Sequence, residues 1–432
     1  MSRLTVAPGG AVRGQLRVPG DKSISHRALL LGALARGTST VRGLSTGDDV
    51  ARTRQAVAAL GVEVVDHPPD GAGGAGGRWL TTAVSSGGPG ALREPGDVLD
   101  VGNSGTTLRL LCGVAASLPF LTVLTGDASL RRRPVDRVAE PLRAMGARVD
   151  GRDGGRLPPV AVRGGGLRGG ELTVAVPSAQ VKSAIILAAL GADGPTVVHQ
   201  PVPTRAHTEE LLVRAGAQVT VADGGRTVTV RPGPVAPLDL TVPGDPSQAA
   251  FWLVAAALAP ESDVVVEDVY AGPARRGFLE VLARMGALVE PVEGGGLRSR
   301  HVGRLRATDV AAEEVPGLVD EIPVLAVAAA AAEGTSRFAG LGELRLKESD
   351  RVAAVAAALR TLGVGCEVHG DDLVVAGGRL GGGTVQAGHD HRMAMAMAVA
   401  GVVAAEPVTI EGWESVATSY PGFERQLDAC RS

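Results

Sequence analysis

Lysine is the charged residue type that this 432-residue sequence uses least. Lysine and arginine together number 43, and only three of these are lysines, at Lys22, Lys182 and Lys347. Arginine serves wherever either cation would do, so a retained lysine is a candidate for a role that needs a compact ammonium group. We expect such a role at Lys22 and Lys347 before Lys182.

Cysteine, aromatic residues and long apolar runs are also scarce. The three cysteines are Cys112, Cys366 and Cys430, and they form no CxxC pair and no disulfide framework. This pattern fits a reducing compartment and disfavours a thiolate metal site. The apolar run 249–259 is too short to span a membrane, and the N-terminal segment has no apolar signal core. Ten aromatic residues and a formal net charge of −3 argue against RNA or DNA as a partner. The sequence predicts a cytoplasmic protein that binds neither membranes nor nucleic acids.

Glycine, by contrast, is abundant, and five of the 61 glycines mark an internal repeat. Each of the five follows an amphipathic helical segment and precedes a β-branched strand, which is the position of a helix C-terminal cap. They lie at intervals of 70 to 85 residues, at Gly61, Gly146, Gly216, Gly286 and Gly363.

A second element recurs six times, a polar turn that opens a helix rich in Ala, Leu and Val. Each turn carries Ser, Asp or Asn, which cap helix N-termini, and each helix lacks a polar face, so we expect it to be buried on nearly every side. The six segments are 19–35, 102–117, 177–191, 243–259, 319–334 and 389–405. Glycine-rich turns are interpreted as hairpin tips, at Gly71–Gly77, Gly151–Gly155, Gly164–Gly166, Gly294–Gly296 and Gly381–Gly383.

These elements define a β-α-β-α-β-β unit that occurs six times. Since single cores rarely exceed roughly 250–300 residues, the sequence predicts an α/β protein of two lobes, each with three units, buried helices and outward-facing sheets. The N-terminal lobe is predicted to span 21–241, and the C-terminal lobe 1–20 and 242–432. The two chain crossings between lobes predict a double hinge with a substrate cleft beside it.

The starts of the small-residue helices carry the unusual polar residues of the N-terminal half. Helix N-termini present free N–H groups and partial positive charge, which favour anions. The first start offers Lys22, Ser23 and Arg27, which suit a phosphate or a carboxylate. The second start holds Asn103 and Gly105, and the glycine would let a ligand approach the backbone closely.

Two further groups of candidates follow in the same half. The run of arginines at 131–133 is expected to contribute one anchored cation, Arg133, rather than three. The third helix start, Ser178-Ala179-Gln180, offers a hydroxyl and an amide that suit sugar or ring hydroxyls.

In the C-terminal half, Asp320 heads an otherwise hydrophobic helix, either as an ordinary N-cap or as a functional carboxylate. The segment 345–351 is densely charged, and Lys347 and Arg351 would share one face if it were helical, with Glu348 beside them. A solvated helix start is the alternative for that segment.

The motif 389–392 contains two histidines, but Arg392 beside them would repel a cation, so no metal site is expected there. The candidate residues together comprise six cations and two carboxylates, a combination that suits two anionic substrates and a proton-transfer reaction. The cations are Lys22, Arg27, Arg133, Lys347, Arg351 and Arg392, and the carboxylates are Asp320 and Glu348.

Over essentially its whole length the sequence resembles the 5-enolpyruvylshikimate-3-phosphate synthase family, the 3-phosphoshikimate 1-carboxyvinyltransferases. The resemblance rests on seven motifs in family order, PGDKSISHRALLLGALA, GNSGTTLRLL, GDASLRRRPVDRV, PSAQVKSAIILAAL, VDEIPVLAVAAA, LRLKESDRV and DHRMAMAMAVAG. It implies a pair of lobes of three β-α-β-α-β-β units each. It also implies transfer of the enolpyruvyl group of phosphoenolpyruvate to shikimate 3-phosphate through a tetrahedral intermediate, by a monomer without metal or organic cofactor.

The resemblance also implies residue roles. Shikimate 3-phosphate would be held by Lys22, Ser23, Arg27, Ser178, Gln180, Asp320 and Lys347. Phosphoenolpyruvate would be held by Lys22, Gly105, Arg133, Arg351 and Arg392, with Asn103 and Gln180 nearby. Asp320 would act as the base on the 5-hydroxyl, Glu348 would exchange the proton at the methylene carbon, and Lys22 would assist the leaving phosphate. Arg205, near the shikimate ring in relatives, is a looser match.

The chain departs from the family pattern at two places. Many members have a Lys-Thr-Phe-Pro run near the C-terminus, which is Thr418-Ser419-Tyr420-Pro421 here, so one phosphoenolpyruvate contact is absent or replaced. A second serine of the Ser178 motif is Ala179, which removes a hydroxyl but keeps the backbone N–H. The family's inhibitor glyphosate occupies the phosphoenolpyruvate site, and Gly105 predicts sensitivity to it.

Two other functions compete with this interpretation. A UDP-N-acetylglucosamine enolpyruvyl transferase shares the fold and donor but uses a reactive loop cysteine, whereas Cys112 lies inside an apolar helix segment. A non-catalytic anion-binding module would need no carboxylates among its cations. The net charge of −3 and the ten aromatic residues argue against an RNA-end-processing relative.

Overall fold

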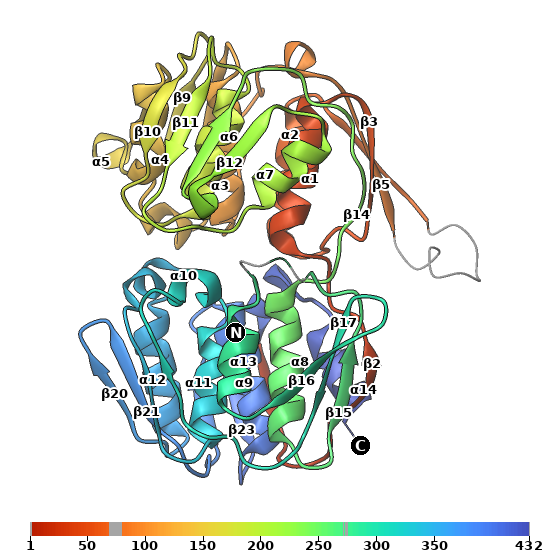
Figure 1. The fold of residues 1–432 in the computed structure, drawn as a ribbon, viewed down its shortest axis with the longest axis vertical. Helices are drawn as coiled ribbons and strands as arrows, with labels where there is room; N and C mark the ends of the chain where they lie inside the picture. Colours follow the sequence, from red (N-terminus) through yellow and green to blue (C-terminus); the bar gives the residue numbers. More distant parts are fainter. Residues whose placement is uncertain (1, 69–79, 271, 273–274, 432) are drawn as a thin grey trace. The chain divides into compact units, whose positions relative to one another are not determined.

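The computed structural model describes residues 2–68, 80–270, 272 and 275–431. The chain divides into two compact units, one of residues 20–242 and one of residues 1–19 together with 243–432 (Figure 1). We call these the 20–242 unit and the terminal unit. Among the described residues, no helix is both long enough and apolar enough to cross a membrane.

The 20–242 unit contains three successive repeats. The first comprises α1 (Lys22–Leu34), β3 (Arg36–Arg42), α2 (Asp48–Ala59), β4 (Glu63–His67) and β5 (Thr81–Gly87). The second comprises β6 (Leu99–Asp100), α3 (Gly105–Ala116), β7 (Leu121–Thr125), α4 (Asp136–Ala144), β8 (Arg148–Gly151) and β9 (Leu157–Arg163). The third comprises β10 (Gly170–Thr173), α6 (Ala179–Ala189), β11 (Thr196–His199), α7 (His207–Arg214), β12 (Val219–Ala222) and β13 (Thr227–Val230), and β14 (Asp239–Thr241) follows.

The terminal unit begins with β1 (Arg3–Val6) and β2 (Arg13–Leu16) and resumes after β14. Its first repeat comprises α8 (Pro246–Leu258), β15 (Asp263–Val266), α9 (Gly277–Arg284), β16 (Leu288–Val292) and β17 (Gly296–Arg300). Its second comprises β18 (Asp309–Val310), α10 (Val315–Leu318), α11 (Ile322–Ala331), β19 (Thr335–Phe338), η5 (Gly342–Leu346), α12 (Arg351–Thr361), β20 (Cys366–His369) and β21 (Asp372–Ala376). Its third comprises β22 (Gly383–Gln386), α13 (His391–Val403), β23 (Val408–Glu411), η6 (Trp413–Thr418) and α14 (Phe423–Cys430).

Each repeat contributes a small mixed sheet that begins with a parallel pair. In the second repeat, β6 runs parallel to β7, and β9 and β8 continue the sheet antiparallel. Two repeats take their parallel strand from a distant part of the chain: β14 pairs with β3, and β2 pairs with β15. In the 20–242 unit the last strand, β14, thus completes the sheet of the first repeat. In the terminal unit the early strand β2 completes the sheet of the first repeat.

The predicted α/β repeat architecture is confirmed, and the six small-residue helices are buried. In α1 every residue from Ile24 to Leu34 is buried, and in α13 every residue from His391 to Val402 is buried. In the terminal unit α8, α11 and α13 contact one another, and in the 20–242 unit α3 contacts both α1 and α6. The small side chains let these helices approach closely at the centre of each unit, while the sheets lie outside them (Figure 1).

The glycines that mark the repeat have the backbone conformation predicted for helix caps. All five of them have positive φ, from 74° to 107° (Gly61, Gly146, Gly216, Gly286 and Gly363). Residues with a Cβ rarely adopt this left-handed conformation, so glycine ends the helix and directs the chain into the next strand.

Two of the predicted hairpin tips are wrong. Gly164–Gly166 and Gly381–Gly383 connect one repeat to the next, whereas Gly151–Gly155 and Gly294–Gly296 do lie between hairpin strands. The reason is close backbone approach: a Cβ on Gly164 would come within 2.1 Å of the carbonyl oxygen of Ala116, at the end of α3. The turn Gly71–Gly77 lies outside the described residues.

The sixth repeat departs from the predicted pattern. Its sheet has three strands in the order β1-β23-β22, and β1 pairs antiparallel with β23. The expected short second helix is present as α14, which follows η6, but no hairpin follows it in the described residues. Phe423, the first residue of α14, packs against Trp252 and Tyr420. The N-terminal strand therefore substitutes for the missing hairpin.

Candidate functional site

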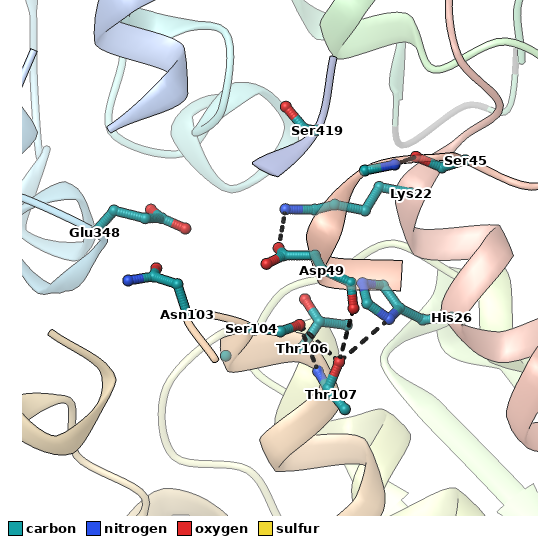
Figure 2. A network of polar contacts seen from close by, with 12 residues as sticks. Lys22, His26, Ser45, Asp49, Asn103, Ser104, Thr106, Thr107, Glu348 and Ser419 are labelled. Atoms are coloured by element: carbon teal, nitrogen blue, oxygen red, sulfur yellow. Dashed lines mark hydrogen bonds and ion pairs between the residues drawn. The ribbon is translucent and has the colours of Figure 1, made fainter. Parts of the chain in front are cut away.

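Lys22 opens α1, and Asp49 of α2 binds its ammonium group. The carboxylate of Asp21 caps α1 by accepting a hydrogen bond from the N–H of Ile24 at 2.9 Å. Lys22 Nζ lies 2.8 Å from Asp49 Oδ2, and the two side chains are 14% and 7% exposed (Figure 2). An anion at this helix start would compete with Asp49 for the ammonium group.

A chain of buried hydrogen bonds connects α1, α2 and α3 beside this ion pair. His26 Nδ1 lies 2.6 Å from Thr53 Oγ1, and Thr53 Oγ1 lies 2.7 Å from Thr107 Oγ1. Thr107 donates in turn to Ser104 Oγ at 2.7 Å (Figure 2). Burial lowers the pKa of His26 well below its ordinary value, and the nearby cations lower it further, so the ring is neutral. These hydrogen bonds fix the start of α3 relative to the start of α1.

At the start of α3, Gly105 lies beside two arginines. A Cβ on Gly105 would come within 2.6 Å of Arg109 Nη1 and 3.4 Å of Arg133 Nη1. Arg133 is the buried member of the 131–133 run, and it donates to the side-chain oxygen of Asn103 and, at 3.3 Å, to its backbone carbonyl. A guanidinium therefore stands at a helix start whose first residue has no side chain.

The start of α6 lies next to the start of α3. Ser178 caps α6, and Ala179 is its first residue. The amide of Gln180 bridges to α3, because Nε2 donates to Thr106 Oγ1 at 2.9 Å and Oε1 accepts from Arg109 Nη1 at 3.2 Å. Two helix N-termini with hydroxyl, amide and guanidinium groups are thus joined.

Arg27 is buried between α1, α6 and α7. Its Nε donates to Thr208 Oγ1 at 2.6 Å and its Nη2 to Ser183 Oγ at 2.8 Å, while Nη1 donates to the carbonyl of Ser23 at 2.9 Å. Burial lowers the pKa of Arg27 to about 10, although the nearby carboxylates of Glu209 and Asp21 oppose this shift, and the half-buried Arg205 adds to it. Arg27 is thus a buried cation whose charge is partly balanced by carboxylates of the same unit.

Lys182, the third lysine, forms a buried ion pair. Its Nζ lies 2.6 Å from Glu209 Oε1, and the two side chains are 1% and 3% exposed. Burial lowers the pKa of Lys182, and Glu209 opposes that shift. This ion pair joins α6 to α7 in the interior of the unit.

In the terminal unit, Asp320 immediately precedes the N-cap of α11. The N-cap is Glu321, whose side chain makes no capping bond, so Asp320 is not the ordinary cap that the sequence left open. Asp320 Oδ1 lies 3.3 Å from Arg351 Nη1 and 3.4 Å from Arg392 Nε. Two guanidiniums therefore contact this carboxylate.

Arg351 contacts three carboxylates. Besides Asp320, its Nη2 lies 2.7 Å from Glu348 Oε2, and its Nε lies 2.7 Å from Asp390 Oδ2. Burial acts to lower the pKa of Arg351, but the three carboxylates raise it above its ordinary value. Arg351 therefore fixes Asp320 and Glu348 next to one another.

Lys347 does not share a helix face with Arg351. It follows η5, whereas α12 begins only at Arg351, because Asp350 caps that helix. Burial lowers the pKa of Lys347, and Asp320 opposes this. The lysine and Asp320 are thus close without being on one helix.

Asp390 and His391 of the motif 389–392 belong to the start of α13. Asp390 caps α13 by accepting the N–H of Arg392 at 3.0 Å, and His391 is buried in the first turn. Within the described ranges, no three His, Cys, Asp or Glu side chains gather in a way that could hold a metal ion.

The run that replaces the family's C-terminal lysine is held by α8. Ser419 Oγ accepts a hydrogen bond from Gln248 Nε2 at 3.0 Å, and the hydroxyl of Tyr420 accepts one from the indole N–H of Trp252 at 3.2 Å. Both side chains are buried. Ser419 and Tyr420 thus pack in the interior, whereas Thr418, which stands at the lysine position, is half-buried.

Sequence reasoning missed several residues of these clusters, chiefly Asp49, Arg109 and the carboxylate role of Asp390. Asp49 sits in the first turn of α2, behind Gly47 and Asp48, and acidic residues in a first turn are usually read as helix stabilisation. Only the three-dimensional pairing with Lys22 shows its role. Arg109 had a detectable signal, since it follows Gly105 by one helical turn.

The sequence profile of the EPSP synthase (3-phosphoshikimate 1-carboxyvinyltransferase) family matches residues 6–427. This chain belongs to that family. The 3-phosphoshikimate 1-carboxyvinyltransferase of Gluconobacter oxydans is 48% identical over 99% of this chain and 97% of its own length. The enzyme of the same name from Thermus thermophilus is 49% identical over 99% of this chain and 98% of its own length.

Solved structures agree with this assignment. The EPSP synthase of Acinetobacter baumannii superposes with a TM-score of 0.84 at 38% identity, covering 99% of this chain and 98% of that one. The enolpyruvyl transferase NikO of Streptomyces tendae has a TM-score of 0.78 at 18% identity, covering 99% of this chain and 97% of that one, which shows a shared fold.

Proposed function

We propose that this chain transfers the enolpyruvyl group of phosphoenolpyruvate to the 5-hydroxyl of shikimate 3-phosphate and releases inorganic phosphate, a step of aromatic amino acid biosynthesis. The observation that carries this proposal is the family match over residues 6–427, which includes every residue given a role below. The curated relatives from two distant organisms bear the name of this activity.

The proposed substrate contacts are those that the family resemblance implies. Shikimate 3-phosphate would contact Lys22, Ser23, Arg27, Ser178, Gln180, Asp320 and Lys347, with Arg205 and the N–H of Ala179 nearby. The buried guanidinium of Arg27 at the α1 start supports the phosphate contact, because burial strengthens its attraction for an anion.

Phosphoenolpyruvate would contact Lys22, Gly105, Arg133, Arg351 and Arg392, with Asn103 nearby. Arg133 beside the side-chain-free start of α3 supports this assignment, since backbone N–H groups and a guanidinium converge there. Asp49 pairs with Lys22, and Asp320, Glu348 and Asp390 pair with Arg351.

The proposed reaction has an addition step and an elimination step. Asp320 would accept the proton of the 5-hydroxyl as its oxygen attacks C2 of phosphoenolpyruvate, and Glu348 would protonate the methylene carbon to a methyl group. Elimination would return a methyl proton to Glu348 as phosphate leaves beside Lys22. The contacts of Arg351 with both acids support their coupled action.

Phosphate release tests the proposal. Release should require both substrates together and should fall by at least about 10²-fold in Asp320→Asn and in Glu348→Gln, because each loses a proton carrier. Glu367→Gln is the matched control, since Glu367 is an exposed carboxylate paired with His369. Turnover within a few-fold of wild type in either site variant would remove that residue from the mechanism.

The alternatives are less well supported. Burial raises the pKa of the Cys112 thiol to about 12, so it cannot supply the reactive thiolate of a UDP-N-acetylglucosamine enolpyruvyl transferase. A non-catalytic anion-binding module would bind both anions without releasing phosphate. Action as a cytoplasmic monomer, without cofactor, membrane or nucleic acid, stays a prediction.

A further inference from the structure

The starts of α1 and α8 share one sequence pattern, Pro-Gly-Asp-Xaa-Ser. In both, the aspartate caps the helix: Asp21 accepts an N–H at 2.9 Å, and Asp245 accepts the N–H of Ser247 at 2.8 Å. The variable position differs, since it is Lys22 in α1 and Pro246 in α8. The terminal unit thus contains a copy of the α1 turn, the proposed anion site, without its lysine.

A carboxylate of the chain itself occupies this copy. Ser247 Oγ donates a short hydrogen bond to Glu321 Oε1. Arg275 Nη2 donates to Ser247 Oγ at 2.9 Å and to Asp245 Oδ1 at 2.7 Å, and its Nη1 lies 3.8 Å from Glu321 Oε1. All four side chains are at most 4% exposed. A hydroxyl, a guanidinium and a helix N-terminus therefore surround the carboxylate of Glu321 where an external anion would otherwise fit.

Glu321 is also the residue that follows Asp320. Arg351 and Arg392 hold the side chain of Asp320, and Arg392 Nη1 donates to its backbone carbonyl at 3.4 Å. Asp320 is thus held by Arg351 and Arg392, whereas Glu321 is held by Ser247 and Arg275. The two residues are adjacent in the chain, so their Cα atoms are only about 3.8 Å apart. Any shift of the α11 start that follows loss of the Glu321 contacts would move Asp320 with it.

We propose that Glu321 is a positioning residue, a built-in anion that fills the α8 counterpart of the α1 anion site and thereby fixes Asp320 for proton transfer. The role of Asp320 in this inference rests on the proposed function. Removing the Glu321 carboxylate should leave a vacancy, lined by Ser247 and Arg275, that a small carboxylate such as formate can enter.

The test is formate rescue of Glu321→Ala. We expect kcat to fall by about tenfold or more with little change in either KM, because a small misplacement of a catalytic group slows chemistry more than binding. Formate should restore kcat in a saturable way, and adding Ser247→Ala should abolish that rescue. Wild type and Glu333→Ala, which removes an exposed glutamate paired with Arg304, should show no response to formate.

Thermal unfolding gives a readout that does not depend on turnover. Formate should raise the melting temperature of Glu321→Ala but not that of wild type, whatever reaction the enzyme performs. An inactive wild type would contradict the proposed function. The melting temperatures would still show whether formate enters the space that the Glu321 carboxylate leaves. Absence of both stabilisation and rescue by formate would overturn the inference.

Glu321→Gln covers the case in which the alanine variant does not fold. It keeps the shape of the side chain but loses the charge that faces Arg275, so we expect a folded protein with reduced kcat and unchanged KM. Glu321→Asp should recover part of the kcat, since it keeps a carboxylate. Wild-type kcat in Glu321→Gln would contradict the positioning role.

Discussion

Lys22 and Asp49 form an ion pair between the first turns of α1 and α2, with 2.8 Å between Nζ and Oδ2. Asp49→Asn leaves the ammonium group mostly buried without its carboxylate, so the substrate-free protein should melt several degrees lower. A substrate phosphate supplies the missing negative charge. We therefore expect shikimate 3-phosphate with phosphoenolpyruvate to raise the melting temperature of Asp49→Asn by more than that of wild type. Equal shifts in differential scanning fluorimetry would show that no substrate anion takes the place of Asp49.

The buried pair of Lys182 and Glu209 should behave differently, because it lies in the interior. Lys182→Met leaves an uncompensated buried charge, and we expect a loss of about 3–5 kcal/mol in the free energy of unfolding. Combining it with Glu209→Leu should recover most of that loss, since an apolar pair replaces the ionic one. Urea denaturation of the two variants measures both numbers. A double variant as unstable as the single one would show that the pair itself stabilises the fold.

The environments of the three lysines in the structure show what the sequence could and could not predict. Scarcity singled them out, and the repeat placed Lys22 at a helix start, since capping residues and helix periodicity are local properties. The sequence ranked Lys182 below the other two lysines, but it could not predict its partner Glu209, which lies on another helix. Residues that act through distant partners, such as Asp49 with Lys22 or Asp390 with Arg351, could not be predicted for the same reason.

The fold itself was more predictable than the pairings. Small-residue helices and capping glycines recur, so the architecture could be inferred without coordinates. The glycine-rich turns were harder to assign, because a glycine at a hairpin tip and one that lies against a helix end, such as Gly164, look identical in sequence. Close backbone approach is a tertiary property.

His26 should make stability depend on pH. Its pKa in the folded protein is far below the ordinary 6.5, so between those two values the unfolded state binds more protons. The free energy of unfolding therefore falls as pH drops below about 6.5, by at most about 1.4 kcal/mol per pH unit from this residue. His26→Gln should show a shallower loss between pH 7.5 and 5 in urea denaturation. His67→Gln, which changes an exposed histidine, serves as the control and should keep the wild-type slope.

Gly105 should control inhibition by glyphosate. The family resemblance assigns this inhibitor to the phosphoenolpyruvate site, so we expect wild-type turnover to fall at millimolar glyphosate and low phosphoenolpyruvate. In Gly105→Ala the new methyl group would meet Arg109 Nη1 at 2.6 Å and Arg133 Nη1 at 3.4 Å. The end of the Arg109 side chain can move aside, so the variant should fold.

The methyl group would nevertheless narrow the space beside Arg133. We expect the concentration of glyphosate for half inhibition to rise by about tenfold or more, with a smaller rise in KM for phosphoenolpyruvate, since steric exclusion of this size is worth about 1–3 kcal/mol. Gly90→Ala is the control, because a Cβ there meets no atom within 4 Å. Full turnover of wild type in millimolar glyphosate, or equal inhibition of Gly105→Ala and wild type, would mean that the α3 start does not line the inhibitor site.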